Sequence, residues 1–386
     1  MKNIGIVCEF NPLHNGHERL LRYARELGAE RVVCVMSGNA TQRGELAVLD
    51  KYTRAKAAIA AGADLVLELP FPWSSASAEY FARAAVAVLS GSCDTLLFGS
   101  ECGDIELICR AATLAATDDF REEYRRRTKS GEGAAGVYFD MLREAGAPLG
   151  SNDLLGVEYV RAIGELGADM TPVTLKREGA DYNDESIDGA SYPSATAIRK
   201  MWQELGFEDS AKHMPRAAYE IYEKAYFEGE MCDIYQLSRA ILMYFRLRSP
   251  EDLQRYAECE GGIANRLCSL AHECSSLEEL YEKLSTKRYT DAKLRRALLF
   301  CLSEVERELL CSLPEYTTLL AADAKGRELL SSQRKSGGIK VVTKPADEPA
   351  ESAQTKASRR LDAIFTLAKM QPNASGEYLK RGAYIE

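Results

Sequence analysis

Histidine is scarce in this sequence, which also lacks both the cysteine spacing of structural zinc proteins and the long apolar runs of membrane proteins. The 386 residues include only 4 histidines and 2 tryptophans. None of the 11 cysteines forms a Cys-x-x-Cys pair, a common spacing in structural zinc sites. No apolar run approaches the roughly 20 residues that a membrane-spanning helix needs. We therefore expect reduced and largely buried thiols, no metal bound by the protein, and no membrane partner.

Targeting signals are missing too, because the chain starts Met-Lys-Asn and passes directly into an apolar segment. This start predicts a cytoplasmic protein. The net charge of −9 argues against a surface that binds nucleic acid everywhere. A local basic surface remains compatible with that charge, because binding depends on where the cations lie. With 46% hydrophobic residues, the chain is long enough for two or three domains.

Strand-like and helix-like patterns alternate in the first half of the chain. Buried strands are predicted at residues 4–9, 31–36, 65–69, 95–98 and 170–175. Helices are predicted at residues 16–27, 51–61, 77–89 and 152–166, with a helical insertion at about 104–168. Such β–α repeats predict an α/β fold with a Rossmann-like parallel sheet. We predict this domain at residues 1–211, followed by a mainly helical C-terminal domain at 212–386 that ends in a smaller mixed segment.

Residues 3–17 carry the most specific pattern. An apolar strand ends at a proline-containing turn, and His14-Asn15-Gly16-His17 then opens a helix. The two histidines, His14 and His17, are three residues apart and share one side of the first helical turn. Free N–H groups and the helix dipole attract anions there, and Gly16 allows a close approach. The pattern predicts a phosphate-binding site at the carboxyl end of a strand.

A second candidate phosphate site begins the helix after residue 193. Ser194 and Thr196 place hydroxyl groups at the helix start, and Arg199 follows one turn later. Such a helix start suits the β- and γ-phosphates of a nucleotide. Serine and threonine are also ordinary N-cap residues, so this motif gains weight only beside the histidine pattern.

The loop at residues 37–45 follows the second predicted strand and contains Arg43 and two glycines. It suits either an anionic or polar substrate or a solvated turn, and the sequence leaves both open. Asp50 is the predicted N-cap of the next helix. Lys51 and Arg54 lie three residues apart on that helix, so they suit either contact with this loop or a surface position, and we favour surface charges.

Two basic clusters are candidate RNA contacts. The first contains Arg125-Arg126-Arg127 and Lys129. The second contains, around Tyr289, the cations Lys287, Arg288, Lys293, Arg295 and Arg296. Cations interleaved with an aromatic residue suit phosphate contacts and base stacking, although a charge run is more often a solvated helix face. In a chain of net charge −9 the second cluster stands out.

Several further motifs follow the histidine pattern in a fixed order. They are Gln42-Arg43-Gly44-Glu45, Asp64-Leu65-Val66-Leu67-Glu68-Leu69-Pro70, Phe98-Gly99-Ser100-Glu101, Ser151-Asn152-Asp153-Leu154-Leu155-Gly156, Lys176-Arg177, Ser194 to Arg199, and Lys287-Arg288-Tyr289-Thr290. Together with Glu9 to His17 they resemble the bacterial tRNA(Met) cytidine acetate ligase family. This family belongs to the H-x-G-H nucleotidyltransferases, whose catalytic domain has a HUP-type fold. The resemblance covers residues 3 to about 300.

The resemblance implies an ATP-dependent ligase with a two-step reaction. Acetate attacks the α-phosphate of ATP and gives acetyl-adenylate and pyrophosphate. The acetyl group then passes to the wobble cytidine of elongator tRNA(Met), giving N4-acetylcytidine. The implied partners are ATP with substrate-bound Mg²⁺, acetate and the anticodon loop of that tRNA. The C-terminal domain would contribute to tRNA binding through Lys287, Arg288, Arg295 and Arg296.

The same resemblance carries site residues onto this sequence. His14 and His17 would be catalytic. The implied ATP-binding residues are Val7, Cys8, Glu9, Phe10, Asn11, Pro12, Leu13, His14, Asn15, Gly16, His17, Glu18, Arg19, Leu20, Gly99, Asn152 and Arg177. The helix-start argument adds Ser194, Thr196 and Arg199 on the phosphate tail.

Three positions depart from the family pattern, and other activities compete with this interpretation. Ala40, Leu46 and Asn183 stand where an aromatic residue, a proline and a histidine are usual, which concerns the acetate or cytidine pocket. Another H-x-G-H adenylyl- or cytidylyltransferase with a small phosphorylated substrate would leave the helical second half unexplained. A non-catalytic nucleotide- or RNA-binding module is not indicated, because both histidines and the arginines are present. A tRNA synthetase relative would need a Lys-Met-Ser-Lys-Ser-like loop, which the sequence lacks.

Overall fold

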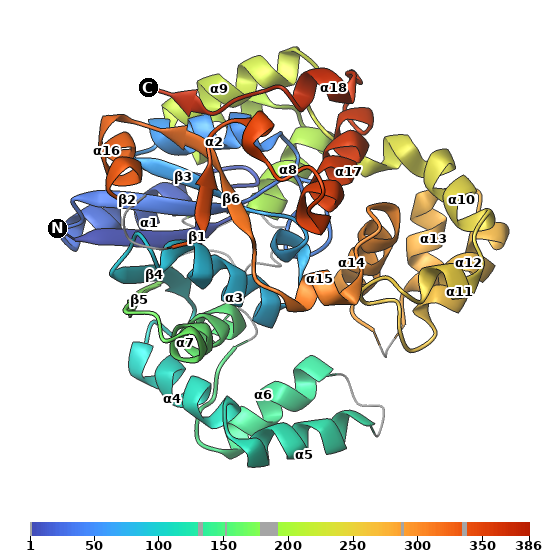
Figure 1. Ribbon diagram of the computed structural model, residues 1–386, viewed down its shortest axis with the longest axis horizontal. Helices are drawn as coiled ribbons and strands as arrows, with labels where there is room; N and C mark the ends of the chain where they lie inside the picture. Colours follow the sequence, from blue (N-terminus) through green and yellow to red (C-terminus); the bar gives the residue numbers. More distant parts are fainter. Residues whose placement is uncertain (1, 130–133, 151–152, 178–191, 287–288, 334–337) are drawn as a thin grey trace.

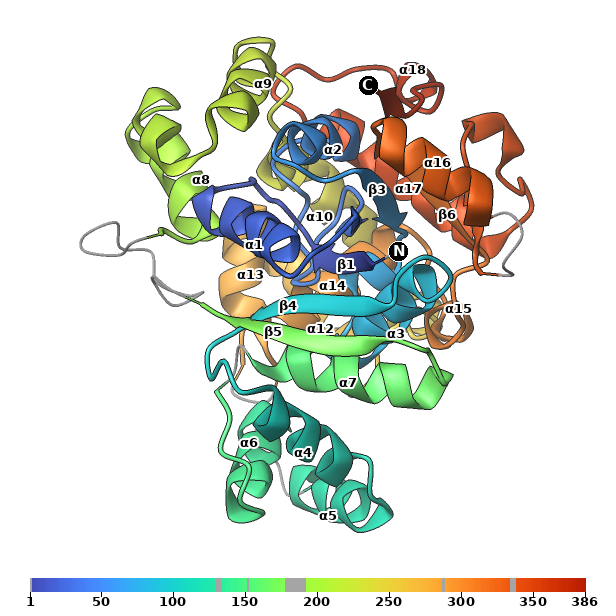
Figure 2. The same cartoon turned by 90° about the vertical axis from the view of Figure 1, so that its left-hand side faces the viewer.

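A central, mainly parallel sheet organises the chain in the computed structural model, which describes residues 2–129, 134–150, 153–177, 192–286, 289–333 and 338–386. The strand order is β5-β4-β1-β2-β3-β6-β7, with β8 paired to β6 (Figures 1 and 2). The strands are β1 (Asn3–Cys8), β2 (Arg31–Ser37), β3 (Leu65–Leu69), β4 (Thr95–Ser100), β5 (Thr171–Lys176), β6 (Tyr316–Ala322), β7 (Lys340–Val342) and β8 (Tyr384–Ile385). All neighbours are parallel except β3 and β6. The predicted α/β class and the five predicted strands are confirmed.

Helices cover both faces of this sheet because its strands are apolar on both sides. Cys34 of β2 belongs to the core shared with α1, α2, α8 and α9, whereas Val33 and Val35 belong to the core shared with α3, α4, α7 and α17. These helices are α1 (Asn15–Glu26), α2 (Lys51–Ala60), α3 (Ala78–Leu89), α4 (Ile105–Ala115), α7 (Leu154–Leu166), α8 (Ala195–Glu204), α9 (Arg216–Phe227) and α17 (Ala353–Leu367).

Two helical lobes project from this body. The first contains α4 with α5 (Asp118–Lys129) and α6 (Ala134–Glu144), and it hangs below β5 and α7 in both ribbon views (Figures 1 and 2). The second has its own apolar core and consists of α10 (Ser238–Arg246), α11 (Pro250–Leu253), α12 (Ile263–Glu273), α13 (Leu277–Leu284) and α14 (Asp291–Leu302). We call them the α4–α6 lobe and the α10–α14 lobe.

The mixed segment near the C-terminus returns to the sheet. β6 pairs antiparallel with β3, with Leu65 opposite Ala322, and β7 and β8 then pair with β6. The segment also contains α15 (Arg307–Cys311), α16 (Ala324–Gln333) and α18 (Ser375–Tyr378). The sheet is therefore completed by residues that the sequence assigned to the C-terminal half. The division into domains at residue 211 stays a prediction.

Lys51 and Arg54 are buried, so their prediction as surface charges is wrong. Arg54 is 0% exposed and donates hydrogen bonds to the carbonyl oxygens of Glu9 (2.6 Å), Ser37 (3.1 Å), Leu49 (2.9 Å) and Gly38. Lys51 donates to Glu68 at 2.9 Å. The ends of β1 and β2 leave backbone carbonyls without strand partners, and a guanidinium satisfies several of them at once. Asp50 is the N-cap of α2, as predicted.

The cysteines agree with a reduced protein. All eleven are free thiols, and eight of them are buried. In the described ranges, no three His, Cys, Asp or Glu side chains gather into a group that could hold a metal ion. Across the same ranges, every helix is too short or too polar to cross a membrane.

Candidate active site

The two histidines of the opening motif cap helix α1. His14 is the N-cap residue, and its Nδ1 accepts the N–H of Gly16 at 3.1 Å. The Nδ1 of His17 accepts the N–H of His14 at 3.2 Å. The pair therefore forms a reciprocal capping box, with ring centroids 3.8 Å apart. Sequence reasoning predicted the helix start but not this mutual cap.

The capping bonds select the tautomer of both rings. A neutral imidazole that accepts through Nδ1 carries its proton on Nε2. Burial, and then Arg177 and His213, lower the pKa of His14 to about 3. Burial, His14 and Arg177 also lower the pKa of His17. Both rings are thus neutral near pH 7 with the proton on Nε2, and both residues line the cleft.

The turn before the histidines is tied to two distant segments and to His17. The carboxamide Oδ1 of Asn11 accepts the N–H of Val48 at 2.8 Å. The N–H of Leu13 donates to the hydroxyl of Tyr222 at 3.2 Å. Phe10 adopts a positive φ of 46° and packs edge-on against His17 with a centroid distance of 5.0 Å. These contacts hold the start of α1 rigidly against the sheet.

Glu9 is a half-buried carboxylate at the start of this turn, directly after β1. Its Oε1 accepts the N–H of Gln42 at 2.8 Å, which ties β1 to the loop after β2. Burial raises the pKa of Glu9, and the Gln42 hydrogen bond and Arg199 oppose that shift. Glu9 lines the same cleft as the histidines.

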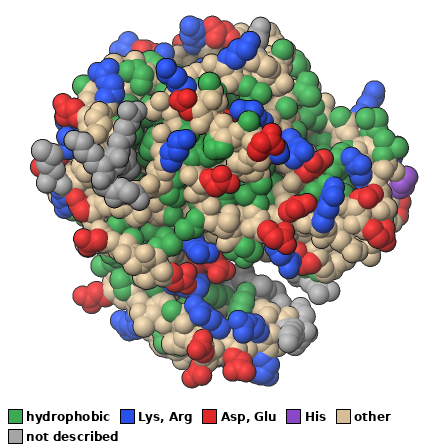
Figure 3. All heavy atoms as spheres, in the orientation of Figure 1, with side chains coloured by type: hydrophobic (Ala, Val, Ile, Leu, Met, Phe, Trp, Pro, Cys, Tyr) green, Lys and Arg blue, Asp and Glu red, His purple; other side chains and the backbone are tan. Residues whose placement is uncertain are grey.

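A cleft of about 1410 Å³ runs along the carboxyl ends of β1, β4 and β5. Figure 3 shows the molecule hollowed between the lower lobe and the body. Of the predicted site residues, those that line the cleft are Val7, Cys8, Glu9, Phe10, Asn11, His14, Gly16, His17, Arg19, Leu20, Gly99, Arg177, Ser194, Arg199, Arg295 and Arg296. Those outside its lining are Pro12, Leu13, Asn15, Glu18 and Thr196. Asn152, Lys287 and Arg288, and the departure at Asn183, lie outside the described residues.

Gly99 and Arg177 meet at the neighbouring ends of β4 and β5. A Cβ on Gly99 would lie 3.2 Å from Cγ of Arg177, so glycine lets the arginine side chain cross the strand end. The N–H of Arg177 donates to the carbonyl of Ser100 at 2.8 Å. Its charge lowers the pKa of both histidines, which places the guanidinium near the capping box.

Helix α8 brings the second motif to the same cleft. Ser194 is its N-cap, and the hydroxyl accepts the N–H of Ala197 at 3.0 Å. Arg199 donates to the carbonyl of Asn11 at 2.7 Å and approaches Thr196 Oγ1 at 3.4 Å. The structure thus joins the two predicted phosphate motifs, which are about 180 residues apart in the chain, through one hydrogen bond.

Glu45 does not line the cleft itself but pairs with two arginines that do, and sequence reasoning gave it no role. Its Oε2 lies 3.4 Å from NH2 of Arg199, and its Oε1 lies 2.6 Å from NH1 of Arg295. The loop reaches α14 closely, because a Cβ on Gly44, which has a φ of +77°, would lie 2.5 Å from the backbone nitrogen of Arg296. The loop at residues 37–45 is therefore packed against α8 and α14 through Glu45, while Gln42 and Arg43 line the cleft, and its role in binding a substrate stays a prediction.

The described cations of the second basic cluster, Lys293, Arg295 and Arg296, are paired with acids from other segments. Arg296 is 8% exposed and pairs with Glu258 at 2.9 Å. Lys293 pairs with Glu260 at 3.0 Å, and Arg295 pairs with Glu45. Local sequence could not predict these pairs, because the acidic partners lie more than thirty residues away in the chain. The guanidinium of Arg296 therefore neutralises a largely buried carboxylate of the protein itself.

The chain is similar to known proteins over nearly its whole length. The family model described as HIGH Nucleotidyl Transferase matches residues 1–379. The tRNA(Met) cytidine acetate ligase of Acetivibrio thermocellus is 35% identical over 376 residues, covering 90% of this chain and 89% of the relative. The protein of the same name from Clostridium perfringens is 33% identical, covering 91% and 92%. A crystal structure of Thermotoga maritima TmcAL bound with alpha-thio ATP has a TM-score of 0.89 and 29% identity, with 100% of both chains covered.

Proposed function

This chain belongs to the HIGH nucleotidyl transferase family and, within it, to the tRNA(Met) cytidine acetate ligases, and we propose on that premise how its cleft works. The enzyme activates acetate with ATP and acetylates the wobble cytidine of elongator tRNA(Met) to N4-acetylcytidine. The resemblance inferred from the motifs is confirmed at the level of the family. We place this activity in the cytoplasm, where tRNA is modified.

The observation that carries the proposal is the histidine capping box at the N-terminus of α1. It places two neutral imidazoles and the positive end of a helix dipole at one cleft with Arg177 and Arg199. Imidazole N–H groups and guanidinium groups together suit the phosphates of a triphosphate. The relative from Thermotoga maritima with the same fold binds an ATP analogue, which supports the assignment.

In the first step an acetate oxygen attacks the α-phosphorus of ATP, and the bond to the pyrophosphate leaving group breaks. Acetate is already ionised at neutral pH, so this step needs no general base. Charge develops on the α-phosphate and on pyrophosphate, and the histidine N–H groups with the two arginines stabilise it without reorganising. Mg²⁺ would be held mainly by phosphate oxygens and water, and it would neutralise part of the triphosphate charge.

In the second step the exocyclic amine of cytidine attacks the acetyl carbonyl, AMP leaves, and the amine loses a proton. The base must be unstacked to reach the carbonyl, as is usual when proteins recognise RNA loops. Acetyl-adenylate hydrolyses if water reaches it, so the buried turn around Phe10 and Asn11 serves to exclude solvent.

Mass spectrometry of tRNA(Met) incubated with the protein, ATP and ¹³C-acetate tests the proposal. We expect one added labelled acetyl group on the wobble cytidine. Acetate-dependent exchange of pyrophosphate into ATP tests the first step alone. Exchange that depends on a nucleotide or phosphorylated small molecule instead of acetate would favour another H-x-G-H nucleotidyltransferase activity.

A further inference from the structure

The cleft extends well past the histidine turn. Its volume of about 1410 Å³ exceeds the roughly 300–1000 Å³ typical of a pocket for one small ligand. The extension lies between α7 and the α4–α6 lobe, and its lobe wall consists of Phe120, Arg121, Tyr124, Arg125 and Tyr138. We call this extension the aromatic chamber. None of these residues takes part in the ATP chemistry described above.

The aromatic wall of the chamber is held in place by contacts among its rings and by a hydrogen bond to α7. Tyr138 contacts Phe120 and Tyr124 edge-on, with centroid distances of 5.6 Å and 5.9 Å. Its hydroxyl donates to Glu158 at 3.4 Å, and Glu158 is paired with Arg161 at 2.8 Å. Tyr124 and Tyr138 are only partly buried, so they offer fixed ring surface to a ligand.

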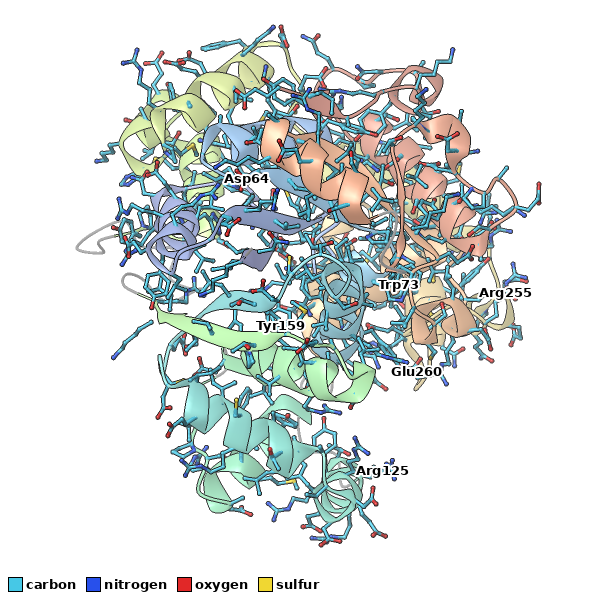
Figure 4. The ribbon with its side chains drawn as sticks, turned by 60° about the vertical axis from the view of Figure 1, so that its left-hand side comes forward. Asp64, Trp73, Arg125, Tyr159, Arg255 and Glu260 are labelled. Atoms are coloured by element: carbon cyan, nitrogen blue, oxygen red, sulfur yellow. The ribbon has the colours of Figure 1, made fainter. Side chains whose placement is uncertain are left out.

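Of the two chamber cations, Arg121 lies 3.7 Å from Glu165 and 3.9 Å from Asp118, and only Arg125 differs from the paired cations across the cleft. Arg121 and Arg125 are one helical turn apart on α5 and both line the chamber. Arg125 is exposed, and the described residues include no ion-pair partner for it. On the opposite wall, Lys293 and Arg295 of α14 are each paired with a glutamate. Figure 4 labels Arg125 at the edge of the lower lobe and Glu260 on the α10–α14 lobe.

We propose that the aromatic chamber binds the unpaired loop of the substrate RNA, with Arg121 and Arg125 on phosphates and Tyr124 and Tyr138 against bases. The proposal rests on the proposed function and names the surface that serves its second step. Aromatic faces beside cations suit single-stranded RNA, in which bases stack and phosphates alternate with them. An acidic peptide would use the cations but not the rings. Continuity with the histidine turn lets one base reach the activated acetyl group while its neighbours stay in the chamber.

Helix α5 supplies a matched pair of variants for the test. Arg126 is equally exposed and on the same helix, but it is paired with Glu123 at 2.7 Å and does not line the chamber. R125E and R126E therefore change the net charge equally and differ in whether the chamber is touched. The probes are an anticodon stem-loop RNA for binding and full tRNA(Met) for acetylation.

We expect R125E to weaken stem-loop binding about tenfold or more and to lower the salt slope of log K by about 1, because one phosphate contact is lost. R126E should stay within about twofold of the unaltered protein. Acetate-dependent pyrophosphate exchange should be unchanged in both, which also shows that both variants are folded. Y124L should weaken binding by about tenfold, and Y124F should restore it, since a stacked base needs the ring and not the hydroxyl.

Equal RNA affinity of R125E and R126E, with the unaltered protein acetylating tRNA normally, would overturn the chamber proposal and leave the proposed function intact. Displacement of the stem-loop from the chamber by an acidic peptide at equal concentration would overturn the choice of RNA. A protein that shows no acetate-dependent exchange at all would contradict the proposed function itself.

Discussion

The inner part of the cleft is formed by residues that are close in the sequence, and the outer part by segments that are far apart in it. The inner part uses the β1–α1 turn, where His14, Gly16 and His17 bond to each other within four residues. The outer part joins the α4–α6 lobe, the loop at residues 37–45 and α14, which are far apart in the chain. The difference teaches that the chemistry of a local motif can be predicted from the sequence, whereas the partners of a run of charged residues cannot.

The outer part itself contains two opposite arrangements of arginine. On α14, Arg296 is buried against Glu258, and Arg295 is half-exposed against Glu45. On α5, Arg125 faces the chamber. An arginine thus supports the fold at one position and is available to a ligand at another.

The largest effect is expected from the adjacent arginines of α14. R296M removes one partner of a buried pair and leaves Glu258 uncompensated, which should lower the free energy of unfolding by about 3–5 kcal/mol. R295M removes a part-exposed partner and should cost about 1 kcal/mol or less. Urea unfolding of both variants measures the difference. Equal losses would show that burial does not distinguish the two pairs.

Next in size is the loss of one histidine donor from the inner cleft. H17A should lower the rate of acetate-dependent pyrophosphate exchange by about 10²–10³, the range seen when one such donor is removed. H272A changes an exposed histidine on α12 and serves as the control, with no expected change. An H17A protein that exchanges pyrophosphate at the normal rate would refute the assigned role.

The smallest effect is a pH dependence of stability that the capping box creates. The pKa of His14 is about 3 in the folded protein and near 6.5 when unfolded. Above pH 6.5 both states are neutral, so His14 contributes no slope. As the pH falls below 6.5, only the unfolded chain gains this proton, and stability falls by up to about 1.4 kcal/mol per pH unit.

The variant H14N tests this slope, because asparagine is a good N-cap residue but does not titrate. The unfolding free energy of the unaltered protein should fall relative to that of H14N between pH 7 and pH 5, because only the unaltered protein carries the His14 slope. Parallel curves would mean that His14 is protonated in the native state, contrary to its burial.

Much of the fold was predictable, because apolar periodicity is a local property. The five strands of the parallel sheet lie where predicted, and α1, α2 and α3 begin within a residue of their predicted starts. The return of β6 to the edge of β3 was not predictable in this way. An antiparallel partner 257 positions away, Ala322, leaves no periodic signal near Leu65.

The site was also predictable in part: its local motifs could be predicted from the sequence, and its long-range ion pairs could not. His14, His17, Arg177 and Arg199 were singled out from the sequence, and the structure brings all four to one cleft. Glu45 was not, because its role depends on two arginines that lie 154 and 250 positions further along the chain. Lys51 and Arg54 were misjudged for the same reason, since their carboxylate and carbonyl partners belong to strand ends and to α17.

The sequence by itself determined the strand–turn–helix with its two histidines, because that geometry follows from neighbours along the chain. Only the tertiary structure decided which cations serve the fold and which face the cleft. An ion pair depends on the distance between charges in space, and chain folding sets that distance independently of sequence separation.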